Sequence, residues 1–203
     1  DSAQVADMMD RTLERFGKID ILVNNAGSRP GKDRVLVVDL EEEALDEVLR
    51  VNVRGTFLCS QAVARHMIAR GGGGKIIVIS SGAGKKGIAK YAAYCASKFA
   101  LVGITQALAL EMASVKVNVN AICPGLLWTP MWELIASHNV NFDETLRGIS
   151  PREAFEKLVE AMIPLGREQT PDDIGNLAAF LASEASRNIT GQSINLNGGY
   201  RFD

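Results

Sequence analysis

Residues 19–24 read IDILVN, and residues 75–80 read KIIVIS. Each stretch is a short, nearly continuous apolar run, which is typical of strands in a parallel sheet because such strands are buried on both faces. A third strand is expected at 116–122 (KVNVNAI), and helical patterns separate the three runs. This alternation of strands and helices predicts an α/β fold, a doubly wound parallel sheet with helices on both faces.

Hydrophobic periodicity predicts the remaining elements. Helices are expected at 2–16, about 41–70, about 91–113, 151–162 and 171–183, and a last strand is expected at 193–197. Residues 126–150 are expected to form a loop with short helical pieces. The sequence contains no internal repeat and no linker that would separate two domains. Residues 1–203 are therefore expected to form a single domain.

The composition excludes several classes of protein. The chain has 203 residues, of which 47% are hydrophobic, and a net charge of −2. It therefore lacks the basic surplus of a protein that binds nucleic acid or an anionic membrane, and no apolar run approaches the about 20 residues that span a bilayer. The three cysteines have no metal-type spacing, so neither a metal site nor a disulfide framework is expected. We expect a cytoplasmic protein with no nucleic-acid or membrane partner.

Polar or glycine-containing segments follow the predicted strands. They are Asn24–Gly27, Ser80–Ser81 and Pro124–Thr129. In a doubly wound sheet, ligands bind beyond the carboxyl ends of the strands. We therefore expect these three segments to border one cleft.

Tyr94 and Lys98 are four residues apart in the predicted helix 91–113, so they share one face of it. An ordinary phenol has a pKa near 10, and a neighbouring ammonium favours the phenolate and lowers that pKa. A phenol with a lowered pKa is suited to general acid–base catalysis. The hydroxyl group of Ser81 could hold a substrate oxygen against the phenol. Taken alone, the pair could also be a surface contact between two turns of a helix.

Six segments carry a resemblance to a known family. They are LVNNAG (22–27), VNV (51–53), IVISSGAG (77–84), YCASK (94–98), NAICPGLLWTP (120–130) and ITGQSINLNGG (189–199). In this order and at these spacings they resemble the short-chain dehydrogenase/reductase family, from the first residues of the chain to the last. The resemblance implies a Rossmann-like fold and an NAD(P)-dependent enzyme that interconverts a secondary alcohol and a ketone by hydride transfer.

The resemblance also implies roles for single residues. Tyr94 would be the catalytic acid/base, Lys98 would lower its pKa and bind the nicotinamide ribose, and Ser81 would position the substrate oxygen. Asn52 would hold a water molecule in a proton relay with the lysine. The residues expected to bind the cofactor are Asn24, Asn25, Ala26, Gly27, Tyr94, Lys98, Pro124, Gly125, Leu127 and Thr129.

Proteins of this family begin with a strand, a glycine-rich turn and a helix. No G-x-G-x-x-G turn follows a strand in this sequence. We therefore expect the N-terminal βαβ portion, with its glycine-rich cofactor turn, to lie upstream of Asp1 in a longer protein, although a fragment that is complete and inactive is the alternative. The residue that distinguishes NAD from NADP follows the second strand of that portion. The cofactor is accordingly expected to be NAD or NADP, with NAD preferred.

The stretch from Pro124 to Pro164 is long for this family and implies a large lid over the site. Trp128 and Trp132 within it could be lid residues or core residues. The length favours a polyol, a sugar or a diol as substrate. A 3-oxoacyl-[acyl-carrier-protein] reductase is the alternative, and a non-catalytic dinucleotide-binding protein is an alternative of another class. Because the family pairs its long helices across a two-fold axis, a homo-oligomer, a dimer or a tetramer, is also implied.

Overall fold

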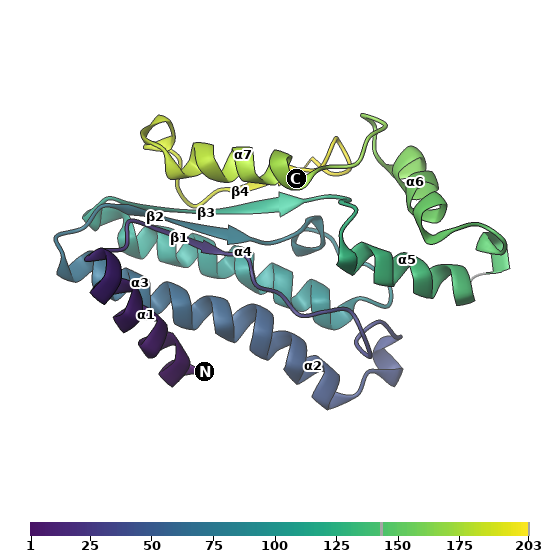
Figure 1. Cartoon of the computed structure of the whole chain (residues 1–203), viewed down its shortest axis with the longest axis horizontal. Coiled ribbons are helices and arrows are strands. Elements are labelled where there is room, and N and C mark those ends of the chain that lie inside the picture. The colour runs from purple at the N-terminus through teal and green to yellow at the C-terminus, as the bar shows by residue number, and fades with distance from the viewer. Residues whose placement is uncertain (143, 203) are drawn as a thin grey trace.

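The computed structural model describes residues 1–142 and 144–202. Within these residues, four parallel strands form one sheet in the order β1-β2-β3-β4 (Figure 1). The strands are β1 (Ile21–Asn24), β2 (Gly74–Ile79), β3 (Val117–Pro124) and β4 (Ser193–Leu196). The register places Asn24 beside Val78, and Ile79 beside Ile122. Because the strands run in one direction, their carboxyl ends lie at the same edge of the sheet.

Helices cover both faces of this sheet, as the sequence predicts (Figure 1). On one side lie α1 (Ser2–Phe16), α2 (Glu42–Leu49), α3 (Gly55–Ala69) and α4 (Ala92–Met112), and on the other lies α7 (Pro171–Ala182). Successive side chains of β2 alternate between the two faces. Ile76 and Val78 pack in the core with α3 and α4, whereas Ile77 packs with Leu181 of α7. The doubly wound parallel sheet is therefore confirmed.

The predicted helix at 41–70 consists of α2 and α3 joined by a π-helical turn, Arg50–Arg54. A π turn contains an i→i+5 hydrogen bond and often lies at a functional site. Here the amide of Gly55 donates to the carbonyl oxygen of Arg50. The turn contains Asn52, one of the predicted site residues.

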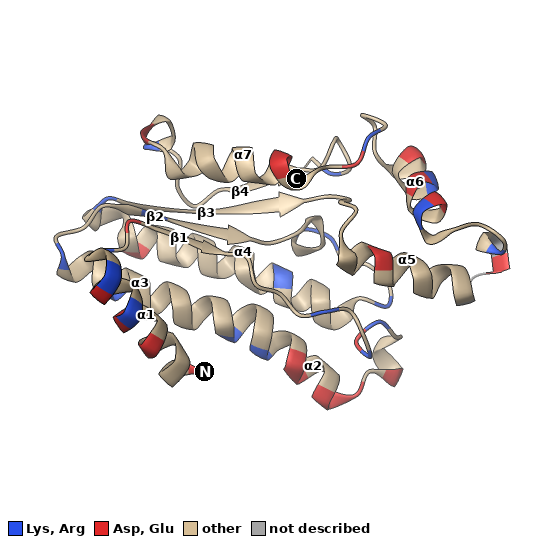
Figure 2. Cartoon of the chain, in the orientation of Figure 1, with Lys and Arg blue, Asp and Glu red and all other residues tan. Residues whose placement is uncertain are grey.

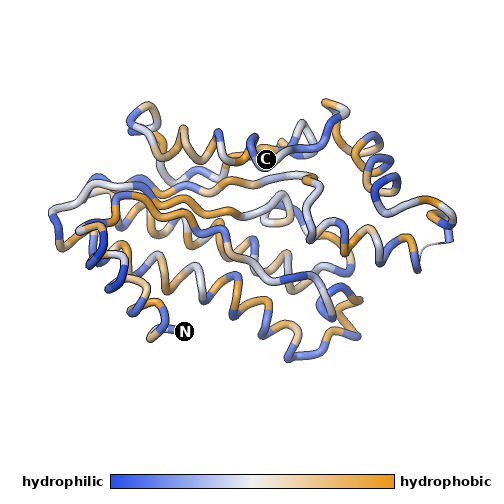
Figure 3. The backbone as a smooth tube through the Cα atoms, viewed as in Figure 1, coloured by the Kyte–Doolittle hydropathy of each residue, from blue (hydrophilic) through white to orange (hydrophobic). Residues whose placement is uncertain are grey.

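Helix α4 is more apolar than we expected from the sequence. Among the described residues, Ala92–Val115, which is α4 with a terminal 3-10 turn, is the one helix long and apolar enough to cross a membrane by length and composition. In the fold it is a core helix, because Leu101, Thr105 and Ala109 lie on one face and are buried. Figure 3 shows apolar residues gathered in the sheet and on the helices that cover it.

Two further helices, α5 (Pro130–Phe142) and α6 (Pro151–Met162), extend beyond the carboxyl ends of the strands (Figure 1). The expectation that 126–150 forms a loop with short helical pieces is wrong for α5, which has 13 residues. Thr129 starts this helix, because its hydroxyl group accepts a hydrogen bond from the amide of Trp132 at 3.4 Å. The local sequence lacks a clear apolar stripe, so periodicity did not reveal α5.

Charged residues lie mainly on the outer helices. Figure 2 shows both signs of charge on α1 and α6 and acidic residues on α2, whereas the strands of the sheet are largely uncharged. The sheet edge where the site lies is therefore formed mostly by neutral groups. The few charged groups near it interact more strongly, because the dielectric constant is low there.

Candidate active site

The carboxyl ends of β1, β2 and β3 border a cavity of about 630 Å³. The segments after these three strands meet there, as their positions in the sequence predict. The predicted site residues that line the cavity are Asn25, Gly27, Ser81, Tyr94, Lys98, Pro124, Gly125, Leu127 and Thr129. The structure therefore brings together residues from three strand ends and from α4.

Three predicted residues lie outside the lining of the cavity. Asn24 ends β1, and its Nδ2 atom donates a hydrogen bond to Oγ of Ser60 on α3 at 3.0 Å. This bond fixes the end of β1 to the helix layer. The other two predicted residues outside the lining are Ala26 and Asn52. The side chain of Asn52 is buried, with 1% of its surface exposed.

Asn52 connects the loop after β1 to the helix that carries Tyr94. Its Oδ1 atom accepts a hydrogen bond from the amide of Ser28 at 2.7 Å, and its Nδ2 atom donates to Oγ of Ser97 at 2.9 Å. The hydroxyl group of Ser97 donates in turn to the carbonyl oxygen of Tyr94 at 2.7 Å. Because every step of this chain is a hydrogen bond, Asn52 fixes the position of the first turns of α4.

The two adjacent serines after β2 have different tasks. The hydroxyl group of Ser80 is buried and donates to the carbonyl oxygen of Lys98 at 3.0 Å. The hydroxyl group of Ser81 accepts from the amide of Ala83 at 3.1 Å and also forms a hydrogen bond with the side chain of Tyr94. Ser81 is thus the serine that lies with the phenol, in agreement with the spacing in the sequence.

Burial raises the pKa of Tyr94 above its ordinary value and is the largest influence on it. The hydrogen bond with Ser81 and the positive charge of Arg34 act in the opposite direction. The sequence led us to expect a net lowering caused by Lys98. In the structure the net direction is upward, because desolvation of the phenolate outweighs the groups that favour it.

Lys98 is buried, with 6% of its surface exposed. Burial lowers its pKa to about 8, so the side chain is mainly an ammonium ion at neutral pH. Its Nζ atom donates to the carbonyl oxygen of Ile79 at 3.0 Å and lies 5.7 Å from the centroid of the Tyr94 ring. The cation and the phenol therefore share one side of α4 at the cavity.

The site combines a phenol, a serine hydroxyl and a buried ammonium at the end of a parallel sheet. The profile of the family described as enoyl-(acyl carrier protein) reductase matches residues 1–201. A short-chain dehydrogenase/reductase of Armillaria gallica is 38% identical over 200 residues, which are 98% of this chain and 72% of that protein. The chain belongs to the short-chain dehydrogenase/reductase family.

Two further proteins resemble this family member closely. Galactitol 2-dehydrogenase of Agrobacterium fabrum is 40% identical over 199 residues, which are 98% of this chain and 75% of that protein. The crystal structure of a variant of actinorhodin polyketide ketoreductase with NADPH aligns with a TM-score of 0.89 at 34% identity, over 98% of this chain and 74% of that chain. The protein is accordingly an oxidoreductase of the short-chain dehydrogenase/reductase type.

In this short-chain dehydrogenase/reductase, part of the cavity wall comes from residues that sequence reasoning missed. Pro171, Ile174, Gly175 and Ala178 of α7 line it, and so does Met131 of α5. The spacing of the four α7 residues places them on one face of a helix. That spacing is a usable signal, but it does not by itself distinguish a face on a cavity from a face on the core.

The part of the chain that the structure describes has no group of three or more His, Cys, Asp or Glu residues able to hold a metal ion. Cys59, Cys95 and Cys123 are free thiols. Cys95, next to Tyr94, is buried, and its Sγ atom lies 4.0 Å from the carbonyl oxygen of Lys86. This buried environment is that of a small packing residue.

An aromatic cluster adjoins the cavity at Trp132. Phe155 of α6 is 1% exposed, and the centroids of Trp128 and Trp132 lie 5.1 Å and 5.2 Å from that of its ring. Trp132 also lines the cavity. The question that the sequence left open is thus answered for Trp132, which packs half-buried against Phe155 and also forms part of the cavity wall.

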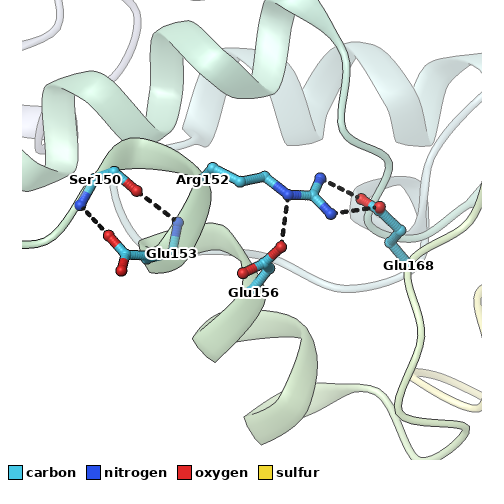
Figure 4. Close-up of polar contacts among 5 residues, drawn as sticks. All are labelled: Ser150, Arg152, Glu153, Glu156 and Glu168. Carbon is cyan, nitrogen blue, oxygen red and sulfur yellow. Dashed lines mark hydrogen bonds and ion pairs between the residues drawn. The ribbon is translucent and has the colours of Figure 1, made fainter.

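Arg152 holds this lid to the rest of the fold (Figure 4). Its Nη1 and Nη2 atoms donate to the carboxylate of Glu168 at 3.0 Å and 2.8 Å, and its Nε atom donates to Glu156 at 2.8 Å. The guanidinium also lies over the ring of Trp128, 5.1 Å from its centroid. A planar, two-point contact of this kind fixes direction as well as distance, so it links the start of α6 to the segment that precedes α7.

Proposed function

We propose that this short-chain dehydrogenase/reductase interconverts a secondary alcohol and a ketone, with Tyr94 as the general acid/base. The observation that carries the proposal is the meeting of Ser81, Tyr94 and Lys98 in one cavity. A ketone oxygen that accepts hydrogen bonds from Ser81 and Tyr94 receives the phenol proton during reduction. In the reverse direction, the phenolate accepts the proton of the alcohol.

The residues present fit the nicotinamide end of NAD or NADP. The cavity lies in the size range of small-molecule sites, and the buried ammonium of Lys98 can donate to ribose hydroxyl groups. Apolar contact comes from Ile79 and Pro124, and the hydroxyl group of Thr129 is available to an amide. When bound, the cofactor supplies or accepts the hydride. Asn25 and Gly27 are proposed to contact its adenosine side.

Lys98 and Asn52 support the proton transfer in this proposal. The ammonium of Lys98 stabilises the negative charge that forms on Tyr94 when the proton leaves. We propose that Asn52 holds a water molecule in a proton relay with Lys98. Its side-chain bonds to Ser28 and Ser97 also support a role in holding the first turns of α4 in place.

A polyol, a sugar or a diol is the substrate class that we propose. Support comes from the similarity to galactitol 2-dehydrogenase and from the long lid formed by α5 and α6. The similarity to a polyketide ketoreductase favours the second candidate, reduction of a 3-oxoacyl thioester. NAD remains our preferred cofactor, although the ketoreductase structure contains NADPH.

We further propose a single catalytic domain that assembles into a dimer or tetramer in the cytoplasm. Apolar side chains that would suit an interface are exposed on α3 and α4. They are Phe57, Ile68, Phe99 and Leu110. The free thiols fit a reducing compartment. Light scattering of the purified full-length protein tests the assembly, and a monomer at micromolar concentration would contradict it.

The catalytic proposal is tested with the full-length protein and a substrate panel. The panel contains polyols, sugars, simple secondary alcohols and a 3-oxoacyl thioester, each with NAD and with NADP in the matching redox state. We expect absorbance of the reduced nicotinamide to change with at least one polyol or sugar. Turnover of the thioester alone would replace the polyol assignment, and no turnover with any member of the panel would refute the proposal.

A further inference from the structure

Arg34 lies on the faces of two phenol rings beside the proposed site. Its guanidinium carbon is 4.1 Å from the centroid of the Tyr91 ring and 4.5 Å from that of Tyr94. The side chain is 13% exposed, and its Nε and Nη1 atoms are buried without a hydrogen-bond partner among the described residues. A cation on an aromatic face is attracted by the ring, and more strongly when water is excluded. The two rings, together with the carboxylate of Asp33, therefore surround a guanidinium that lacks hydrogen bonds at these two atoms.

The loop after β1 holds Arg34 in this position. The neighbouring Asp33 is 4% exposed, and its Oδ2 atom lies 3.4 Å from Nη1 of Arg34. The Oδ1 atom of Asp33 accepts a hydrogen bond from the amide of Gly31 at 2.9 Å. Because Asp33 is fixed by its own loop, it directs the guanidinium toward the rings.

The guanidinium is closer to the Tyr94 ring than the ammonium is. The distances to the ring centroid are 4.5 Å for the Arg34 carbon and 5.7 Å for Nζ of Lys98, which is bound to the carbonyl oxygen of Ile79. Arg34 is also the charged group that lowers the pKa of Tyr94 most, after the hydrogen bond with Ser81 and against the larger effect of burial.

Several other titratable groups face these rings. Tyr91 and Cys95 lie on or next to α4 and raise the pKa of Tyr94. Burial is the largest influence on the pKa of Tyr91 and raises it, Arg34 lowers it, and Asp33 raises it. The thiol of Cys123 on β3 interacts with Lys98. The cations of Arg34 and Lys98 lie 4.5 Å and 5.7 Å from the centroid of the Tyr94 ring.

We propose that Arg34 is a positioning residue for Tyr94, which holds the phenol ring against α4 and adds a second positive charge to that of Lys98. The proposal rests on the proposed function, since the charge affects turnover only if Tyr94 exchanges the proton. Arginine and lysine differ in the contacts they can make with the rings. The planar guanidinium can lie on two rings while it stays charged at any working pH, which the ammonium of Lys98 cannot do.

The first test is the pH dependence of kcat/KM for alcohol oxidation by the full-length enzyme. Arg34→Met removes the charge, Arg34→Lys keeps it without the planar group, and Lys32→Met removes a charge from an exposed side chain of the same loop. We expect the rising limb of the Arg34→Met profile to move up by about one pH unit, because the phenolate loses a nearby cation. The Arg34→Lys profile should move by less than half of that, and the Lys32→Met profile should stay in place. An unmoved profile for Arg34→Met overturns the proposal.

The second test needs no substrate, so it separates this proposal from the catalytic one. The ultraviolet absorbance of ionised tyrosine is titrated in each protein and in its Tyr94→Phe counterpart, and the difference reports the Tyr94 phenol alone. We expect the midpoint to rise by about one pH unit in Arg34→Met, and in Arg34→Gln if the methionine variant fails to fold. Equal midpoints contradict the role of Arg34 even in an active enzyme. Absence of turnover in the unmodified enzyme, with a shifted midpoint, refutes the catalytic proposal and leaves the electrostatic finding intact.

Discussion

The ammonium of Lys98 donates a hydrogen bond to the carbonyl oxygen of Ile79 at 3.0 Å. Lys98 belongs to α4 and Ile79 is the last residue of β2, so this bond joins the helix that carries Tyr94 to the centre of the sheet. The hydroxyl group of Ser80 donates to the carbonyl oxygen of Lys98 in the opposite direction. The contact depends on Gly84, because a Cβ atom there would lie 2.7 Å from that carbonyl oxygen.

The burial of Lys98 makes stability depend on pH. Burial lowers its pKa from 10.5 to about 8 in the folded protein. Between these pH values the unfolded chain binds more protons than the folded one, so this residue makes the protein more stable as pH rises through that window. Compared with Lys98→Met, the unmodified protein should gain about 3 kcal/mol of unfolding free energy between pH 8 and pH 10.5.

Urea denaturation at several pH values measures this gain. Lys157→Met, which removes an ammonium group at an exposed position of α6, is the control for the loss of a lysine side chain. If the gap between Lys98→Met and the unmodified protein stays constant from pH 8 to pH 10.5, the ammonium of Lys98 is not buried as described.

Asn52→Ala should affect both stability and turnover. The change leaves the amide of Ser28 and the hydroxyl group of Ser97 without their buried partner, which costs about 2 kcal/mol. The first turns of α4 then lose a restraint, so kcat should fall more than KM rises. Chemical denaturation and steady-state kinetics measure the two effects. The matched control is Asn188→Ala at an exposed position, and equal stability of the two variants would rule out the structural role of Asn52.

Phe155→Ala tests the lid. The ring is buried between Trp128 and Trp132, so its removal should cost about 3 to 5 kcal/mol of unfolding free energy. Because Trp132 lines the cavity, KM for the substrate should rise as well. Phe180→Ala on α7, where the side chain is 41% exposed, should cost less and leave KM within about twofold. An unchanged KM for Phe155→Ala would show that the aromatic cluster does not contribute to substrate binding.

Much of the fold is predictable from local signals. The parallel strands follow from buried apolar runs, and β2 lies at Gly74–Ile79 where 75–80 was expected. Helix α7 begins at its expected position, because Thr170 and Asp173 form a capping box there. Helix α5 and the π turn at Arg50–Arg54 were missed. The first lacks an apolar stripe, and the second depends on contacts of Asn52 with residues distant in the sequence.

In the candidate site, too, local sequence patterns predict some features, and features that depend on distant contacts are missed. Helical spacing predicts that Tyr94 and Lys98 share a face, and the resemblance to the family predicts Ser81 as their partner; the structure brings all three to one cavity. The contact of Arg34 with Tyr94 was not found, since it depends on the path of the loop after β1. The upward direction of the Tyr94 pKa was also missed, because spacing reports neighbours and not the extent of burial.

The central claim is that the hydroxyl group of Tyr94 carries the proton. The most direct measurement compares kcat/KM of Tyr94→Phe with that of Tyr91→Phe, a change that removes a neighbouring hydroxyl group and keeps its ring. We predict a loss of about 1,000-fold for Tyr94→Phe, within the range of general acid–base catalysis. We predict that Tyr91→Phe stays within about threefold of the unmodified enzyme. Turnover by Tyr94→Phe at the rate of the unmodified enzyme would contradict the account.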